Sequence, residues 1–251
     1  YADATINLIS RGETNSFVPS FHSALPASSS LVTHLDSYKR LDTLISSYLK
    51  FSMRNSKVAK SLSLLIHGNE GTGKQMACRK IAEALNLHLL EINCFEVLGE
   101  SDAVTEDHFR QLFHVARDCA PCLVALRHFD AVAKEEASMP AQAKASKIRL
   151  VRALQEEVQK QAKKYPLIVI ASVEKLEELS LLFRTSTLFT EKIPFAATLE
   201  YEQRLGMLKD ALSSLNGVYL SREVMLEDLA RTLTGASYTD MRNFIDNAKM
   251  Q

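Results

Sequence analysis

The sequence has no surplus of charge of either sign, and this absence limits the partners that the protein can attract through a net electrostatic field. Its 251 residues include 30 lysines and arginines against 30 aspartates and glutamates, so the formal net charge is zero. Nucleic-acid binding through the overall field needs a basic surplus. We therefore expect no nucleic-acid partner. The hydrophobic share of 46% and the charged share of 24% are those of an ordinary globular protein.

Long hydrophobic runs are also missing. Apolar runs such as 64–66 and 167–171 have the length of core strands, whereas a membrane span needs roughly 20 apolar residues. A basic stretch followed by an apolar one, as in a secretion signal, is absent too, and the chain starts at Tyr1. We therefore expect no direct membrane insertion, and we expect this chain to be a piece of a longer protein.

Only four cysteines occur, and their spacing favours neither a metal site nor a redox site. Cys119 and Cys122 form a C-x-x-C pair, but Cys78 and Cys94 have no neighbouring cysteine or histidine that would complete a zinc site. Cys119 ends a helical stretch and Cys122 begins an apolar strand, which is unlike a redox helix. We expect inert thiols, no zinc site and a reducing compartment.

Alternating strands and helices predict a parallel α/β sheet with helices on both faces. The helices include one over residues 31 to about 53 and a long charged one over about 141 to 164. This alternation is typical of parallel strands joined by crossover helices. The predicted strands are, in order, SLSLLIH, LHLLEIN, CLVALRHF, PLIVIAS and EKIPFA.

The two ends of the chain follow other patterns. Residues 1–30 are rich in serine and proline without a sustained period, so we expect a linker or arm there. After residue 197 three helical stretches follow with no strand between them, and Thr198 and Ser221 are expected as N-caps. The sequence thus predicts an α/β domain over 31–197 and a small all-α domain over 198–251.

The segment GNEGTGKQ carries the strongest chemical signal. It lies between an apolar strand and an amphipathic helix, and its glycines and lysine follow the order G-x-x-x-x-G-K of a phosphate-binding loop. Backbone N–H groups in such a loop point at phosphates, and the following helix adds the positive end of its dipole. The alternative is a glycine turn that only joins strand to helix. We predict a nucleotide site made of Gly68, Asn69, Glu70, Gly71, Thr72, Gly73, Lys74 and Gln75.

The last residue of this loop departs from the pattern. A serine or threonine normally follows the lysine, and its hydroxyl ligates Mg²⁺. Gln75 stands there instead, and its amide is a poor replacement for a directly coordinating hydroxyl. We therefore expect the loop to bind ATP, while its use of Mg²⁺ stays open.

The strand expected to face the nucleotide lacks the acids that hydrolysis needs. In P-loop ATPases such a strand supplies a carboxylate for the metal. Arg127 and His128 follow Leu126; arginine keeps its proton and ligates no metal, and a histidine at a strand end is more often structural than catalytic. Asp130 lies two positions further on, where we expect strand alternation to point it elsewhere. We assign no catalytic residue and no metal ligand.

With these motifs in place, the chain from about residue 30 to 251 resembles an ATPase module of the AAA family, an α/β domain with a phosphate loop followed by a helical lid. The family's third strand reads roughly hhhhDEhD, and LVALRHFD resembles it with both key acids replaced. Glu174 stands where the family usually has an asparagine that places water. Only Arg184 lies near the two arginine-finger positions, which Thr185 and Leu188 occupy. The loop VLGESDAV lacks the family's polypeptide-gripping aromatic.

The run from Leu87 to Val132 resembles, more narrowly, the degenerate first ATPase domain of the double-ring AAA proteins of peroxisome biogenesis. This resemblance implies an ATP-binding domain that does not hydrolyse ATP and acts as an assembly platform in a hetero-hexamer, alternating with peroxisomal biogenesis factor one. It also implies hydrolysis in a second domain and a membrane anchor through regions outside this chain. The implied location is the cytoplasm at the peroxisomal membrane, where the import receptor is recycled.

Two other interpretations of the residues stay open. One is an active ATPase with unusual ligands, in which Asp130 or Glu174 supplies the missing carboxylate. The other is a module that binds no nucleotide and contributes only protein contacts. Phosphate release that depends on Lys74 would identify the first, and titration with labelled ATP, with and without Mg²⁺, would identify the second.

Overall fold

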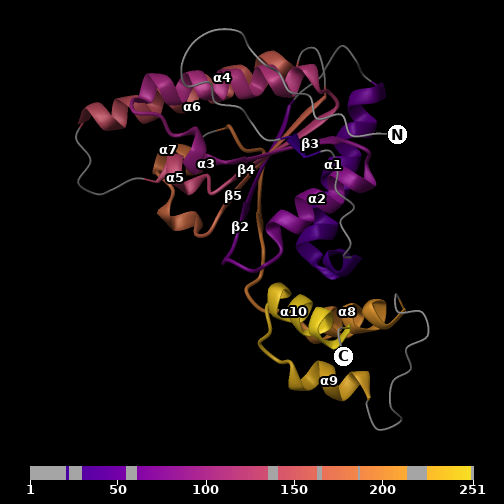
Figure 1. The fold of residues 1–251 in the computed structure, drawn as a ribbon. Helices are drawn as coiled ribbons and strands as arrows, with labels where there is room; N and C mark the ends of the chain where they lie inside the picture. The colour runs from indigo at the N-terminus through magenta and orange to yellow at the C-terminus, as the bar shows by residue number, and fades with distance from the viewer. Residues whose placement is uncertain are drawn as a thin grey trace.

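A mixed sheet forms the centre of the larger part of the protein. The computed structural model describes residues 21–22, 30–54, 61–134, 141–162, 166–185, 187–213 and 225–249. These residues form a six-stranded sheet in the order β1-β3-β4-β5-β2-β6, and all but β1 run parallel (Figure 1). The parallel strands, each predicted from the sequence, are β2 (Leu62–His67), β3 (His88–Asn93), β4 (Cys122–Arg127), β5 (Leu167–Val173) and β6 (Glu191–Pro194).

The remaining strand, β1 (Phe21–His22), lies within the segment expected to be a linker or arm and pairs antiparallel with β3. Two residues are too few to show a period of two, so the sequence gives no signal for this strand. Residues 1–20 and 23–29 lie outside the described part of the chain, and the arm stays a prediction.

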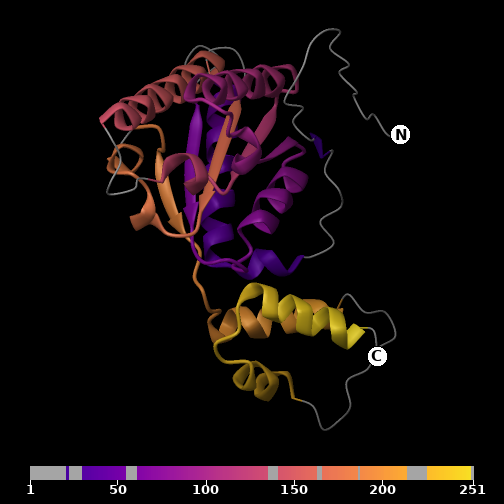
Figure 2. The ribbon, with the colours of Figure 1, turned by 60° about the vertical axis from the view of Figure 1, so that its left-hand side comes forward.

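Successive residues of each strand face two separate cores, as the period of two requires. In β2, Leu64 and Ile66 pack on the face covered by α1 and α2, whereas Leu65 packs on the face covered by α4 and α6 (Figures 1 and 2). The predicted covering of both faces by helices is therefore confirmed. These helices are α1 (Asp36–Arg54), α2 (Lys74–Ala84), α4 (Asp102–Asp118) and α6 (Ala141–Ala162).

Two predicted segments differ in detail. The helix expected from residue 31 is divided into a 3₁₀ turn, η1 (Ser30–His34), and α1, which begins after Leu35. The polar loop expected after β3 contains a short helix, α3 (Cys94–Val97), and α4 begins as early as Asp102. Asn93 and Ser101 cap these two helices through their side-chain oxygens, which is the local signal that fixes both starts.

Beyond the carboxyl-terminal edge of the sheet lies a helical lid (Figure 1). Its described helices are α8 (Tyr201–Ser213), α9 (Leu226–Thr232) and α10 (Tyr238–Lys249). The N-cap predicted at Thr198 is wrong, because α8 begins at Tyr201 and the Glu200 N–H is met by the Gln203 side chain at 3.1 Å. Ser221 lies outside the described residues, and the domain boundaries stay a prediction.

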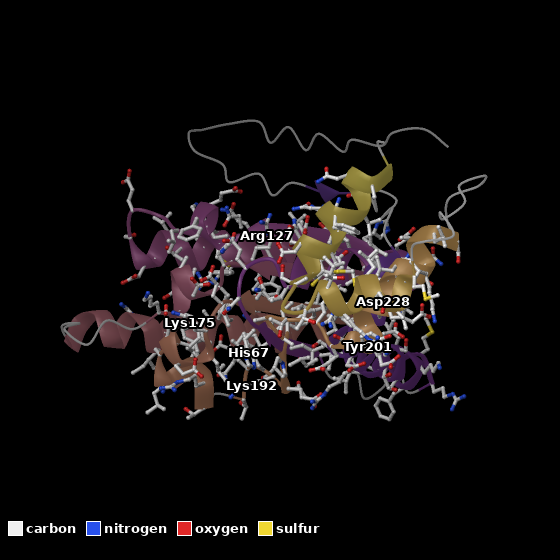
Figure 3. All side chains as sticks on the ribbon, turned by 90° about the horizontal axis from the view of Figure 1, so that it is seen from below. His67, Arg127, Lys175, Lys192, Tyr201 and Asp228 are labelled. Carbon is white, nitrogen blue, oxygen red and sulfur yellow. The ribbon has the colours of Figure 1, made fainter. Side chains whose placement is uncertain are left out.

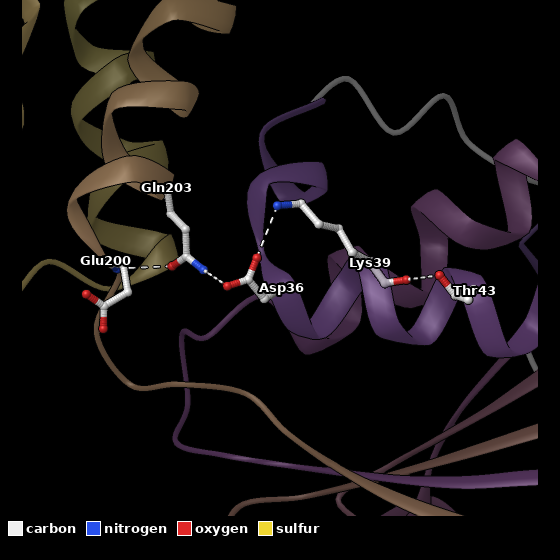
Figure 4. A network of polar contacts seen from close by, with 5 residues as sticks. All are labelled: Asp36, Lys39, Thr43, Glu200 and Gln203. Atoms are coloured by element: carbon white, nitrogen blue, oxygen red, sulfur yellow. Dashed lines mark hydrogen bonds and ion pairs between the residues drawn. The ribbon is translucent and has the colours of Figure 1, made fainter.

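Polar contacts join the lid to the start of α1. The Gln203 amide donates to Asp36 at 3.2 Å, and Asp36 also pairs with Lys39 at 3.1 Å (Figure 4). On the preceding turn, the His34 ring lies 2.7 Å from the Asp210 carboxylate. Gly206 makes this approach possible, since a Cβ there would lie 2.5 Å from the imidazole of His34. The lid is therefore packed directly on η1 and α1.

The described helices contain none that is long and apolar enough to cross a membrane.

Candidate nucleotide-binding site

A cavity of about 320 Å³ lies where β2, β4 and β5 end. The loop residues 70–75 line one side of it, and the ends of β4 and β5 line another. Helix α10 of the lid supplies the third side. The parallel strands thus bring residues from distant parts of the sequence to one edge, which is where open α/β sheets bind ligands.

Glycine is required at three positions of the loop. Gly71 and Gly73 have φ of +78° and +88°, in the left-handed region that side chains rarely adopt. A Cβ on Gly73 would lie 3.0 Å from the ring of Tyr238. At Gly68 a Cβ would lie 2.3 Å from the carbonyl oxygen of Phe195. The glycines therefore give the loop its curvature and leave room for the lid and for Phe195, directly after β6.

Lys74, the first residue of α2, folds back on the loop. Its ammonium donates to the carbonyl oxygens of Gly68 and Asn69, the second at 2.7 Å. Burial lowers the pKa of Lys74, and the carboxylates of Glu174, Glu70 and Asp130 oppose this shift. The ammonium is thus held inside the loop by weak neutral acceptors, which a phosphate can replace with stronger, charged ones.

The two residues after Leu126 were predicted to end the strand that faces the nucleotide, and both of them, Arg127 and His128, line the cavity. Figure 3 views this edge from the lid side, with Arg127 at the end of β4 and His67 at the end of β2. His128 has φ of +51°, and its ring lies 5.5 Å from that of Phe95. Ser172 holds the turn, since its carbonyl accepts the Phe129 N–H at 2.9 Å.

The expectation for Asp130 was wrong. Strand alternation does not reach this residue, because β4 ends at Arg127 and the left-handed His128 redirects the chain. Asp130 begins α5 (Asp130–Ala133) and lines the same cavity, and its Oδ1 is buried without a hydrogen-bond partner among the described residues. Glu174 lines the cavity as well. Both carboxylates considered for an active ATPase are therefore present at the site.

The usual ligands of magnesium are replaced at both of their positions, and the carboxylates that line the cavity, Glu70, Asp130 and Glu174, stand at other positions. Mg²⁺ takes oxygen ligands in near-octahedral geometry, and Gln75 and Arg127 occupy the two usual ligand positions. The Thr72 hydroxyl is buried and donates to the Asn69 carbonyl at 2.9 Å. Across the described part of the chain, no group of three or more His, Cys, Asp or Glu side chains could hold a metal ion.

Sequence reasoning missed the contribution of the lid. Tyr238, Thr239 and Arg242 of α10 line the cavity, and Thr239 donates two hydrogen bonds to the carbonyl of Gly71. Ser237 and Asp240 form a reciprocal cap at the start of this helix. The Ser-x-x-Asp spacing could have located that start, but no local pattern places α10 on the loop.

Arg79 of α2 was missed as well. It lines the cavity and forms a forked ion pair with Glu91 of β3, at 2.7 Å for the closest atoms. Glu91 is only 7% exposed. Next to this pair, burial raises the pKa of the Cys78 thiol to about 12, which keeps it protonated and unreactive at neutral pH.

Comparison with known proteins places this geometry in context. The model of the "ATPase family associated with various cellular activities (AAA)" matches residues 64–197, just over half of the chain. Peroxisomal ATPase PEX6 of Arabidopsis thaliana is 34% identical over 89 residues, which is 35% of this chain and 10% of that protein. The proteins of the same name from Rattus norvegicus and Homo sapiens are each 26% identical, over 74% and 71% of this chain. The chain spans less than a fifth of the length of these relatives.

Proposed function

The chain belongs to the AAA family of ATPases, and from that premise we propose that it is a domain that binds ATP without hydrolysing it. The observation that carries the proposal is the pairing of a phosphate loop and its Lys74 with Arg127 and His128 at the end of β4. The loop and Lys74 bind phosphate. Arg127 and His128 supply no oxygen ligand for a metal, and arginine cannot act as a base.

The residues present fit a nucleotide. Gly71 and Gly73 give the loop its curvature and let Thr239 and Tyr238 of the lid approach it, and α2 begins at Lys74 with its positive dipole end toward the cavity. Lys74 would exchange its two loop carbonyls for the β- and γ-phosphates. Tyr238 and Thr239 would keep water from the loop side of the nucleotide.

One observation favours a second function, that of an active ATPase. The Asp130 carboxylate lines the cavity with one buried oxygen that has no partner among the described residues, so it is available to a water or a cation. We rank this function second because Asp130 lies on α5, after the chain has turned at His128, and the position of the usual base is occupied by His128 itself.

We also propose that nucleotide acts here as a structural ligand. The loop and the lid are bonded to each other, so a ligand held by both stabilises the folded arrangement by mass action. ATP at about 1,000 times its Kd would contribute about 4 kcal/mol. A site that holds ATP in this way suits an assembly platform, because the contacts between subunits then depend on bound ATP and not on its hydrolysis.

The relatives named peroxisomal ATPase support a wider proposal. In it, this domain is part of a hetero-hexameric double ring with peroxisomal biogenesis factor one, and a second domain outside this chain hydrolyses ATP. The ring acts from the cytoplasm at the peroxisomal membrane, to which other regions anchor it, and recycles the import receptor.

The test combines binding and turnover in the same chain. We expect saturable binding of a fluorescent ATP analogue, its loss in Lys74→Ala, and its retention in Lys80→Ala, a lysine of the same helix whose partner is Glu83. We expect no phosphate release above that of Lys74→Ala. Release that depends on both Lys74 and Asp130 would instead support the active ATPase, and no saturable binding at all would support a module of protein contacts alone.

A further inference from the structure

We propose that this site binds ATP free of magnesium, with the Arg127 guanidinium supplying the positive charge that the metal supplies in other members of the family. The inference rests on the proposed function, because it specifies the form of nucleotide that the same site accepts. Its basis is a double replacement at the two positions from which P-loop proteins hold Mg²⁺.

Both replacements lie in one cavity. Gln75 is the second residue of α2, at the position of the ligating hydroxyl, and Arg127 is the last residue of β4, at the position of the ligating carboxylate. Arginine has five N–H donors and no acceptor, so it repels a metal ion and attracts the phosphate oxygens that the metal would bridge. The pair of changes thus exchanges a metal site for a phosphate site.

Arg127 is held in place and its charge is open to a ligand. Its backbone pairs with Asn93 of β3, and Ser172 of β5 donates to the carbonyl of Leu126 at 3.3 Å, directly before it. Among the described residues, no hydrogen bond or ion pair engages the Arg127 side chain. A guanidinium fork can therefore meet two phosphate oxygens at once.

Cations and carboxylates line the cavity in nearly equal number, so the affinity for ATP depends on which cations are open to a ligand. Metal-free ATP carries more negative charge than its magnesium complex, and Lys74, Arg127 and Arg242 face it from three different elements. Within the described ranges, the Arg242 guanidinium makes only a 3.5 Å contact with Asp246 on its own helix. Opposing these cations are the carboxylates of Glu70, Asp130 and Glu174, and of these Asp130 is the one buried oxygen donor that a metal could use. The test therefore includes Asp130.

The decisive comparison needs no substitution. The 251-residue chain is titrated with a fluorescent ATP analogue in excess EDTA and again in excess Mg²⁺. We expect the Kd in EDTA to be equal to or lower than that in Mg²⁺. Arg127→Gln should weaken binding in EDTA by roughly tenfold to a hundredfold, the range for a lost charged hydrogen bond. Arg117→Gln, at the far end of α4, should leave it unchanged.

A converse variant restores the usual ligands. Gln75→Thr combined with Arg127→Asp should bind the analogue at least about tenfold more tightly with Mg²⁺ than with EDTA. Circular dichroism of each variant establishes that it is folded, and the wild-type comparison stands whatever the variants do.

Two outcomes would overturn the inference. Wild-type binding that is tenfold or more tighter with Mg²⁺ would do so while leaving the proposed function in place. If Asp130→Asn abolished that metal effect, Asp130 would be identified as a ligand of the metal. Absence of saturable binding in both buffers would overturn the inference together with the proposed function.

Discussion

The hydroxyl and the backbone N–H of Thr239 both donate to the carbonyl oxygen of Gly71, at 2.9 and 3.0 Å. The two residues are 168 positions apart in the chain, one at the start of α10 and the other in the phosphate loop. A single loop carbonyl therefore accepts two bonds from the lid. Loop conformation and lid position are coupled through this contact, and a nucleotide that binds the loop is bound against the lid.

Removing one of the two bonds should weaken the coupling. Thr239→Val keeps the N–H and the shape but loses the hydroxyl, and we expect a loss of about 1 kcal/mol in unfolding free energy. Hydrogen exchange at the Thr239 amide should become faster. Thr232→Val, which loses only a bond to Asp228 within α9, should leave that amide unaffected. Equal exchange rates at Thr239 in both variants would contradict the coupling.

Gly73 and Gly235 form a matched pair for testing the loop. Both have φ near +88°, but a Cβ on Gly73 meets the Tyr238 ring at 3.0 Å and Leu35 at 3.2 Å, whereas a Cβ on Gly235 meets no atom of the described residues within 4 Å. Gly235→Ala should cost only the backbone strain, about 1–2 kcal/mol, and keep ATP binding. Gly73→Ala should cost more in denaturant unfolding and lose ATP binding. Similar losses in the two variants would show that the lid contact is unimportant.

The sequence predicted the elements better than the site. Periodicity identifies β2 to β6 and the covering helices. Each of these elements packs against a core, and its buried positions therefore appear in the sequence as apolar residues at a regular spacing. The loop residues Gly68 to Lys74 follow from spacing alone. The two-residue strand β1 depends on pairing with β3, and this information is not local.

The remaining parts of the site depend on contacts between distant segments. Tyr238, Thr239 and Arg242 reach the cavity because α8 packs on η1 and turns the lid toward the loop, and no residue within α10 encodes that position. Asp130 was misplaced because strand alternation was extended past Arg127, although a left-handed His128 follows. A non-glycine residue with positive φ is uncommon, so sequence reasoning had no cause to end the strand there.

The ion pair between Arg79 and Glu91 should be a large local contribution to stability. Because Glu91 is 7% exposed, Arg79→Ala would leave a buried carboxylate without its partner, at a cost of about 3 kcal/mol or more. Arg231→Ala, which removes an exposed pair with Asp228, should cost less than about 1 kcal/mol. Urea denaturation of both variants measures the difference. Equal, small costs would mean that Glu91 is solvated.

The lowered pKa of Lys74 makes stability depend on pH. Between that pKa and the unfolded value of 10.5, the folded chain has lost the proton and the unfolded chain has kept it. The unfolded state then binds more protons, so the unfolding free energy rises with pH across this window, and the gain is lost as pH falls through the lowered pKa. In urea titrations from about pH 8 to 10.5 the difference in unfolding free energy between wild type and Lys74→Met should rise, while the raised pKa of the buried cysteines, such as Cys78, lowers both curves equally. Parallel curves would contradict the burial of this ammonium.

The chemical identity of the nucleotide that the protein holds tests the central claim most directly. The 251-residue chain is incubated with ATP, separated from free nucleotide and denatured, and the released nucleotide is identified by ion-exchange chromatography. The account predicts ATP, unchanged after prolonged incubation, in wild type and none in Lys74→Ala. Recovery of ADP that accumulates with time in wild type, and that disappears in Asp130→Asn, would contradict it.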